Sequence, residues 1–349
     1  MRLGKWLLFV VILAGCGSAP PAASPRATPD PSTGLILPAG YSAAIVATGL
    51  NQPTHIAVGP DGALYLTQLN GGENDGTGQV VRITKPGAAP EVVLDGLTKP
   101  TGLTWAGTEL YIVAGNNVLE SHVDSTGKFS SLVVAFANLP FNGRSEGQIS
   151  TGPDGNLFFQ STGNETMPLA SGFIYSARPG GGTKEIFARG LKNAYAMIWD
   201  KPTGRMYATE IGDGAIPGIG QPPEELNLVR RGGNYGWPYC YADQLENPAW
   251  HGTRDYCADT DVPLATFPPD STPTGLAIYD RQLIAALWNG SPPRLMRVDM
   301  SSGQVAEFAA GFKRPIALLT VESDGSFDGL LVVDMDAGTV WRLLQTPPK

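Results

Sequence analysis

The stretch "GLNQPTHIAVGPDGALYLTQ", Gly49 to Gln68, joins an apolar run, a tight Pro-Asp-Gly turn and a second, alternating run. Versions of it recur every 47 residues, beginning at Gly96, Gly143 and Gly190. Two weaker copies begin at Pro273 and Gly311, which brings the number of repeats to six. A period in the forties built of short strands is typical of a β-propeller, in which each repeat forms one blade. The repeats therefore predict an all-β fold, a six-bladed β-propeller.

Each repeat contains four candidate strands. In the first repeat, Ile56 to Val58 and Leu64 to Thr67 flank the turn, Val80 to Thr84 follows, and "EVVLDGL" from Glu91 is the fourth. A copy of that fourth strand, "AAIVATGL" from Ala43, precedes the first repeat. We therefore expect the N-terminal strand to be the outermost strand of the last blade, which closes the ring and leaves no long open edge.

The composition supports a turn-rich fold and excludes one class of partner. Among 349 residues there are 44 glycines, and only 16% of residues are charged, which favours many turns over long solvated helices. The net charge of −8 argues against a phosphate-binding surface, so no nucleic-acid partner is expected.

The N-terminus, "MRLGKWLLFVVILAGCGS", places two cations before a short apolar run, as an export signal does. The run is shorter than the roughly 20 residues that a membrane-spanning helix needs. "LAGC" resembles the lipobox of bacterial lipoproteins, whose cysteine, here Cys16, carries lipid. We expect a signal peptide and lipobox over 1–16, a Pro/Ala/Ser-rich tether over 17–34 and the propeller over 35–349. The protein would be exported and anchored by lipid to a bacterial membrane, facing the periplasm or the cell exterior; an ordinary cleavage site near Cys16 is the alternative.

An insertion of about 214–270 separates the fourth and fifth repeats, after the inner strands of the fourth blade. It contains Cys240 and Cys257, and an exported chain with one such pair most simply forms a disulfide between them. Insertions of this kind either shape the mouth of the central channel or form a surface loop, and the sequence leaves both open.

The segment "PPEELNLVRRGGNYGWPYC", Pro222 to Cys240, resembles the glucose/sorbosone dehydrogenase family, in which an acidic-acidic-hydrophobic-Asn run leads to Gly-x-x-Tyr-Gly-Trp-Pro. Members are six-bladed propellers that use pyrroloquinoline quinone and calcium to oxidise aldoses. The resemblance implies both cofactors and a small-molecule sugar substrate. The aromatic residues of the segment are either packing at a twisted corner or a platform on which a sugar stacks.

The resemblance assigns roles to individual positions. Lys192 and Asn193, in "GLKN", match the family's quinone-contacting Arg-Asn, with lysine in place of arginine, and Arg314 matches a cofactor-facing arginine. Metal candidates are Glu210 and Gly212, which match a segment beside the calcium, and Glu224, Glu225 and Asn227, whose oxygen atoms suit that hard cation. The last three are alternatively ordinary strand and turn residues.

One departure from the family concerns catalysis. The family's base is a histidine at the start of the third blade, where this chain reads "NGRSEGQISTGPDG", Asn142 to Gly155, with no histidine. Arg144 is the candidate for the lost position, but arginine stays protonated. Glu146 would serve only if desolvation raised its pKa and its side chain reached the channel. His55, beside the first inner strand, is the other candidate.

The sequence therefore predicts a quinone-dependent sugar dehydrogenase-like oxidoreductase whose catalysis is impaired by the missing histidine. Two alternatives remain open: a catalytically silent propeller that binds a saccharide or an envelope protein, and a calcium-dependent lactonase-like hydrolase.

Overall fold

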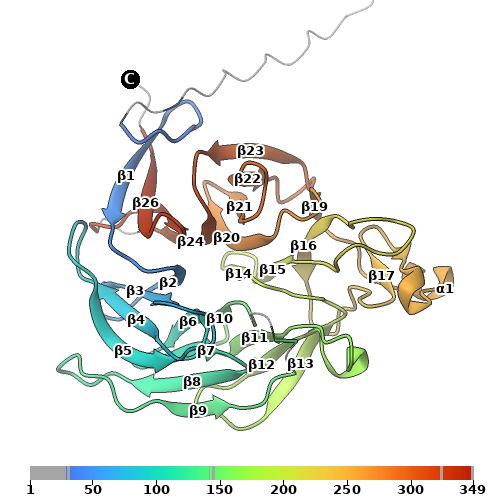
Figure 1. The fold of residues 1–349 in the computed structure, drawn as a ribbon, viewed down its shortest axis with the longest axis horizontal. Coiled ribbons are helices and arrows are strands. Elements are labelled where there is room, and N and C mark those ends of the chain that lie inside the picture. Colours follow the sequence, from blue (N-terminus) through green and yellow to red (C-terminus); the bar gives the residue numbers. More distant parts are fainter. Residues whose placement is uncertain (1–28, 30–31, 141, 144–145, 323–324, 347–349) are drawn as a thin grey trace, which may run out of the picture.

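A computed structural model describes residues 29, 32–140, 142–143, 146–322 and 325–346. Six four-stranded antiparallel sheets are arranged as blades in a ring around a central axis (Figure 1). The predicted six-bladed β-propeller is thus confirmed.

In blades 1 to 5 the strands run in chain order from the axis outward, and in blade 6 the outermost strand is β1. Blade 1 consists of β2 (Pro53–Val58), β3 (Leu64–Gln68), β4 (Gly78–Ile83) and β5 (Glu91–Leu97). Blade 2 consists of β6 (Pro100–Ala106), β7 (Glu109–Ala114), β8 (Asn117–His122) and β9 (Val133–Phe136). Blade 3 consists of β10 (Ile149–Thr151), β11 (Leu157–Ser161), β12 (Phe173–Ala177) and β13 (Lys184–Arg189), with the 3₁₀ turn η1 (Pro168–Ala170) between β11 and β12.

The second half of the ring contains the longer connections. Blade 4 consists of β14 (Met197–Asp200), β15 (Arg205–Glu210), β16 (Glu224–Val229) and β19 (Ala265–Phe267). Blade 5 consists of β20 (Pro273–Tyr279), β21 (Gln282–Leu287), β22 (Arg294–Val298) and β23 (Val305–Ala310). Blade 6 consists of β24 (Pro315–Val321), β25 (Gly329–Asp334), β26 (Thr339–Gln345) and β1 (Tyr41–Ala47).

The ring closes as the sequence predicts. The N-terminal strand β1 pairs antiparallel with the C-terminal strand β26, with Tyr41 opposite Gln345 and Ala44 opposite Arg342. In Figure 1 the blue strand β1 and the red strand β26 lie side by side in this blade. The first and last strands, β1 and β26, are therefore hydrogen-bonded into one sheet, which closes the ring between the last blade and the first.

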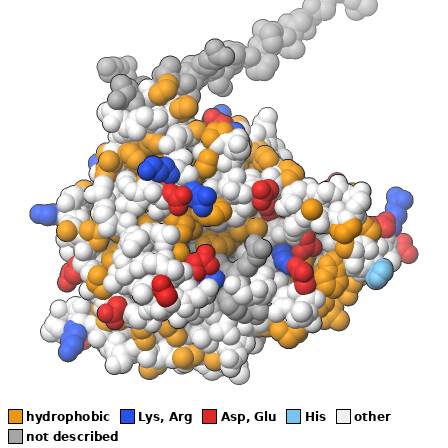
Figure 2. Space-filling model, viewed as in Figure 1, with side chains coloured by type: hydrophobic (Ala, Val, Ile, Leu, Met, Phe, Trp, Pro, Cys, Tyr) orange, Lys and Arg blue, Asp and Glu red, His pale blue; other side chains and the backbone are white. Residues whose placement is uncertain are grey.

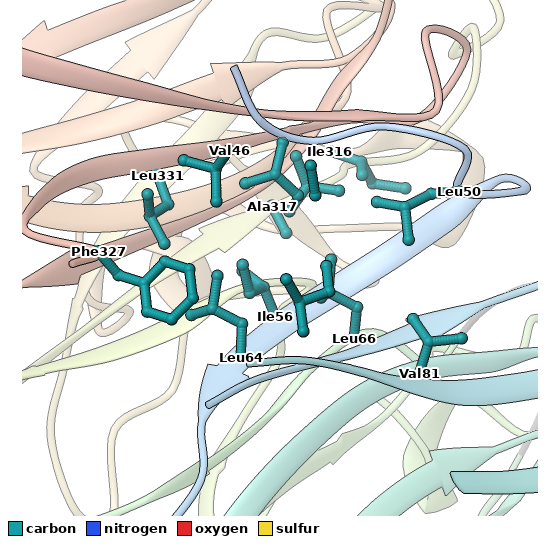
Figure 3. Packing of buried hydrophobic residues seen from close by; sticks show 14 residues of the cluster. Val46, Leu50, Ile56, Leu64, Leu66, Val81, Ile316, Ala317, Phe327 and Leu331 are labelled. Carbon is teal, nitrogen blue, oxygen red and sulfur yellow. The ribbon is translucent and has the colours of Figure 1, made fainter. Parts of the chain in front are cut away.

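Apolar side chains between neighbouring blades form the core. Between blades 6 and 1, Val46, Ile56, Leu64 and Leu331 pack together and are at most 1% exposed (Figure 3). Along β3, Leu64 and Leu66 face this interface and Tyr65 faces blade 2, because successive side chains of a strand point to opposite faces. The blades consequently form one continuous, rigid ring.

Threonine hydroxyls near the axis join the blades by hydrogen bonds. Thr54 Oγ1 donates to Pro100 O at 2.7 Å, and Thr101 Oγ1 donates to Gly147 O at 2.7 Å. Each bond runs from the inner strand of one blade to the start of the next, and it satisfies polar groups that are buried there. The inner strands are thereby fixed relative to one another around the axis.

The stretch 214–270 contains two strands of blade 4, β16 and β19, as well as a long excursion between them. We call residues 230–264 the disulfide loop; it carries β17 (Cys240–Tyr241), β18 (Leu245–Glu246), the 3₁₀ turn η2 (Pro248–Trp250) and the helix α1 (Arg254–Ala258). Cys240 and Cys257 are bonded within it, as predicted. Figure 1 shows this loop projecting from the side of the ring. Within the described ranges, no helix has the length and apolar character needed to cross a membrane.

The disulfide is expected to keep the loop ordered. Replacing both Cys240 and Cys257 by serine should destabilise the folded loop by about 3 kcal/mol, since the bond closes a segment of this length in the unfolded chain. Limited proteolysis under native conditions, with urea unfolding of the same samples, measures the change. The reduced wild-type protein should behave like the double variant; equal resistance of the oxidised wild type and the double variant would contradict the prediction.

Candidate functional site

The inner strands surround a central cavity of about 720 Å³, which we call the mouth. All six blades contribute to its wall, through Thr54, Thr101, Thr162, Tyr195, Thr274 and Ile316. Figure 2 shows this face, where charged side chains gather around a central hollow. The volume is in the range of small-molecule sites, which is roughly 300–1,000 Å³.

Two lysines lie in the wall of the mouth, and carboxylates neutralise both. Lys192 Nζ lies 2.9 Å from Glu165 Oε1 and 3.2 Å from Asp213 Oδ1, with its side chain only 10% exposed. Lys99 Nζ lies 2.9 Å from Glu73 Oε2. Including Glu224 and Asp270, the described residues of the mouth comprise two lysines and five carboxylates, a formal charge of −3.

Asn193, next to Lys192, is also in the wall, and its Oδ1 accepts a hydrogen bond from Gln160 Nε2. Arg314 is placed differently. Its guanidinium lies 4.3 Å from the ring centre of Trp288 and pairs with Asp336 at 3.1 Å. Trp288 lines the mouth, whereas Arg314 is not among the lining residues.

The aromatic residues of the quoted family segment are packed away from the mouth. The Trp237 ring fits against Gly163 and Gly172, where an added Cβ would come within about 2.8 Å of it. Its Nε1 donates to Asp213 Oδ1 at 3.0 Å, and Lys192 Nζ lies 5.0 Å from the ring centre. Trp237 therefore supports the Lys192 and Asp213 pair from behind rather than stacking on a ligand in the mouth.

A pair of buried carboxyl groups lies where blade 4 meets the disulfide loop. Glu210 on β15 is directly opposite Glu225 on β16, and Asn227 follows on the same face of β16. Asn227 Nδ2 donates to Glu210 Oε2 and Glu225 Oε2, each at 3.2 Å. Lys192 N donates to Glu210 Oε1 at 2.5 Å, and Ala242 N donates to Glu225 Oε1 at 2.6 Å.

Burial and mutual repulsion oppose ionisation of this pair. Desolvation, followed by the charge of Glu225, raises the pKa of Glu210 well above its usual range, and desolvation raises the pKa of Glu225 to about 7. Asn227 Oδ1 has no hydrogen-bond partner among the described residues, and a cavity of about 20 Å³ lies beside the two carboxyl groups, enough for roughly one water-sized species. Two carboxylates and a free amide oxygen are donors that suit a calcium ion, so these residues fit one.

The five predicted metal candidates do not converge on one point. Glu224 points to the other face of β16, as an adjacent residue of a strand must. It lies in the wall of the mouth, accepts a hydrogen bond from Gly212 N at 2.7 Å, and burial raises its pKa to about 7. Within the described ranges, no group of three or more His, Cys, Asp or Glu side chains is arranged to hold a metal.

Glu146 lies at the start of blade 3, and its side chain is 1% exposed. Its Oε2 accepts hydrogen bonds from Thr162 N at 2.6 Å and from Thr162 Oγ1 at 3.1 Å, while its Oε1 has no partner in the described part of the chain. Desolvation raises the pKa of Glu146 to about 8. Thr162 lies in the wall of the mouth, so this carboxyl group is one hydroxyl away from it.

The other two base candidates are less suited to that role. His55 is outside the wall of the mouth; its Nδ1 accepts a hydrogen bond from Leu103 N at 3.2 Å, and burial lowers its pKa to about 4. Gln148, which bonds His55, also donates Nε2 to Thr274 O at 2.9 Å. His55 is therefore part of a polar bridge between blades. Arg144 lies outside the described residues, as does Cys16.

Lys99 and Asp213 are mouth residues to which the sequence analysis gave no role. Lys99 could have been found from the repeat, because it is the third residue after the repeat glycine, the same place that Glu146, Asn193 and Arg314 occupy. Asp213 has no such signal, since its partners Trp237 and Asn247 come from the disulfide loop.

The fold is a six-bladed β-propeller, and on its axis lies a cavity whose volume is in the range of small-molecule sites. A family model described as glucose/sorbosone dehydrogenase matches residues 169–309, so the resemblance to that family is confirmed. An uncharacterized protein of Synechocystis is 32% identical over 102 residues, which are 28% of this chain. The match spans only 22% of the length of that curated relative.

Solved structures share the architecture over most of the chain. A glucose dehydrogenase-type oxidoreductase of Thermus thermophilus has a TM-score of 0.67 at 21% identity and covers 87% of this chain and 100% of its own. A PQQ-bound aldose sugar dehydrogenase of Streptomyces coelicolor has a TM-score of 0.67 at 20% identity, covering 88% and 100%. The PQQ domain of a Coprinopsis cinerea pyranose dehydrogenase reaches 0.70 at 17% identity, covering 93% and 98%. At these identities the likeness establishes the common fold.

Proposed function

We propose that the protein is a quinone-dependent sugar dehydrogenase in which Glu146 takes the place of the family's histidine base. The observation that carries the proposal is the position of Glu146. It lies at the start of blade 3, in the same segment as Arg144, the position that matches the family's base; its pKa is raised to about 8, and one threonine hydroxyl joins it to the mouth. A general base works best when its pKa lies near the working pH.

Lys192 and Asn193 in the mouth would hold pyrroloquinoline quinone. Glu210 and Glu225, which we call the acid pair, would hold calcium together with Asn227. The quinone, when bound, accepts the two electrons that leave the sugar. Glu146 would receive the hydroxyl proton through Thr162 Oγ1, which would accept it from the sugar and pass its own proton to the carboxylate. At a pKa of about 8, only about one carboxyl in ten is ionised at pH 7, so turnover should be slow.

Calcium is expected to be required for quinone binding. The quinone is a tricarboxylate, and the described residues of the mouth already carry a formal charge of −3, so the two repel each other unless a divalent cation offsets the charge. Titration of the purified domain with quinone should give an affinity at least about tenfold higher with calcium than with chelator. Equal affinities under both conditions would contradict this expectation. Magnesium is the matched control, because it demands shorter, octahedral coordination.

Reconstitution tests the proposed function directly. The domain with calcium and quinone should show cofactor absorption, a raised melting temperature and slow dye reduction with aldoses. Absence of quinone binding would favour the silent propeller, which the existing ion pairs of both mouth lysines also favour. A lactonase-like hydrolase would need oxygen ligands from several blades in the mouth, whereas the acid pair and Asn227 come from blade 4 alone.

We also propose that Cys16 carries lipid and holds the exported domain on a bacterial membrane. The support is the sequence "LAGC" after a short apolar run. A Cys16→Ser form should lose its membrane association in cell fractionation, with the soluble fraction containing the folded domain. Unchanged membrane association of that form would reject the anchor.

A further inference from the structure

A second large cavity lies on the outside of the ring. It has a volume of about 650 Å³ and is bounded by η1, by β13 and by the disulfide loop; we call it the outer groove. In Figure 2 an apolar surface lies at the lower right over these elements, whose places are shown in Figure 1. Nothing in the proposed chemistry of the mouth uses it.

The lining of the outer groove is apolar and aromatic. Leu169 and Ile186 are 75% and 53% exposed at its edges, although leucine and isoleucine side chains are usually buried. Tyr239 and Tyr256 form an edge-to-face pair along the wall, with ring centres 5.3 Å apart. Such a lining suits a planar, largely apolar molecule.

One cation accompanies these apolar side chains. Arg189, at the end of β13, is exposed and lines the groove, and within the described part of the chain it forms no ion pair. The chain as a whole has a net charge of −8, so an unpaired guanidinium in an apolar groove is a specific feature. It complements an oxygen-bearing or anionic group on the occupant.

A single indole separates the outer groove from the mouth. Trp237 lines the groove, and on its other side it bonds Asp213 and underlies Lys192, both of which line the mouth. The η1 connection also touches both sites, because Leu169 borders the groove while Glu165 pairs with Lys192. An occupant of the groove is therefore placed next to whatever fills the mouth.

We propose that the outer groove binds the electron acceptor, a planar quinone of the benzoquinone or naphthoquinone class, and that Trp237 is the wall through which the electrons pass. The inference rests on the proposed dehydrogenase function. The acceptor quinone would take up two electrons and two protons and become its quinol, which would return the mouth's cofactor to its oxidised form. The apolar lining holds the ring, and Arg189 donates to an acceptor oxygen.

The test begins with binding to the protein without cofactor, by calorimetric titration with 1,4-naphthoquinone-2-sulfonate. Wild type should bind, and Leu169→Ser, Ile186→Ser and Arg189→Gln should each weaken binding by about tenfold. All three side chains are exposed, so these variants should fold normally. Val133→Ser is the matched control, since Val133 is 57% exposed on the outer strand of blade 2, away from the groove, and this variant should bind as wild type does.

Three outcomes would overturn the proposal: no binding, binding that the groove variants leave unchanged, or equally tight binding of naphthalene-2-sulfonate, which lacks the quinone oxygens. A second measurement follows the loaded protein. Leu169→Ser should slow reoxidation of the cofactor by the naphthoquinone and leave reduction of the cofactor by sugar unchanged. Equal slowing of both steps would also contradict the proposal that the outer groove binds the acceptor. Because cofactor binding in the mouth is titrated separately, failure of the proposed function and failure of this inference give different results.

Discussion

Replacing Glu146 by glutamine is expected to lower sugar oxidation by the reconstituted protein by roughly 100-fold to 10,000-fold, the usual contribution of a general base. Quinone affinity should be unchanged, because Glu146 lies behind Thr162 rather than in the wall of the mouth. The wild-type rate should also rise with pH up to about 8, as Glu146 ionises, and the variant should lack this rise. Steady-state rates from pH 6 to 9 measure both effects.

The same substitution should stabilise the fold. The pKa of Glu146 is about 8 in the folded protein and near 4.5 in the unfolded chain, so raising the pH between these values favours unfolding. Glutamine stays neutral, and above pH 8 the variant should be more stable than wild type by about 3–5 kcal/mol, with little difference at pH 4.5. Lower activity together with higher stability would show that burial of the Glu146 carboxyl group serves catalysis at a cost in stability. Loss of both activity and stability would identify Glu146 as a structural residue only. Glu225→Gln is a comparison variant for the stability measurement, because it replaces a similarly buried carboxyl group that lies outside the mouth.

The fold could be predicted from the sequence because its evidence is local. The 47-residue period and the Pro-Asp-Gly turns fix the number of blades, and the copy of the outer strand at Ala43 fixes how the ring closes. The division of the metal candidates of β16 between its two faces could have been predicted from local sequence in the same way. Strand alternation alone separates Glu224 from Glu225 and Asn227, once this segment is assigned to blade 4 rather than to the insertion.

The rest of the site depends on contacts between distant segments. Trp237 packs on Gly163 and Gly172 from blade 3, and Lys192 forms an ion pair with Glu165 from the same blade. Residue type and spacing do not specify such contacts, because they depend on how the disulfide loop folds back. The sequence identified the condition that Glu146 must meet, a raised pKa, but the burial that raises it is a property of the assembled ring.

His55 should make the protein sensitive to mild acid. Its pKa is about 4 in the folded protein, against 6.5 in an unfolded chain, because burial disfavours the imidazolium and Leu103 N needs Nδ1 as an acceptor. The unfolded chain therefore takes up a proton first as the pH falls, and the contribution of His55 to stability, full above pH 6.5, is lost between pH 6.5 and about 4. The buried carboxyl groups have the opposite effect. The raised pKa values of Glu146, Glu224 and Glu225 make the folded protein less stable as the pH rises.

The histidine contribution is isolated by comparing wild type with His55→Asn, whose side-chain oxygen can still accept from Leu103 N but does not titrate. The difference between the two free energies of unfolding, measured in urea, should change by about 3 kcal/mol from pH 7 to pH 4, with the wild type losing more. The smaller volume of asparagine adds only a constant offset, because cavity formation does not depend on pH. His251→Asn, at an exposed site in the disulfide loop, is the matched control for loss of one imidazole. A pH-independent difference would mean that His55 is not held neutral, and the polar bridge from blade 1 through Gln148 to Thr274 would then carry a charge across the channel.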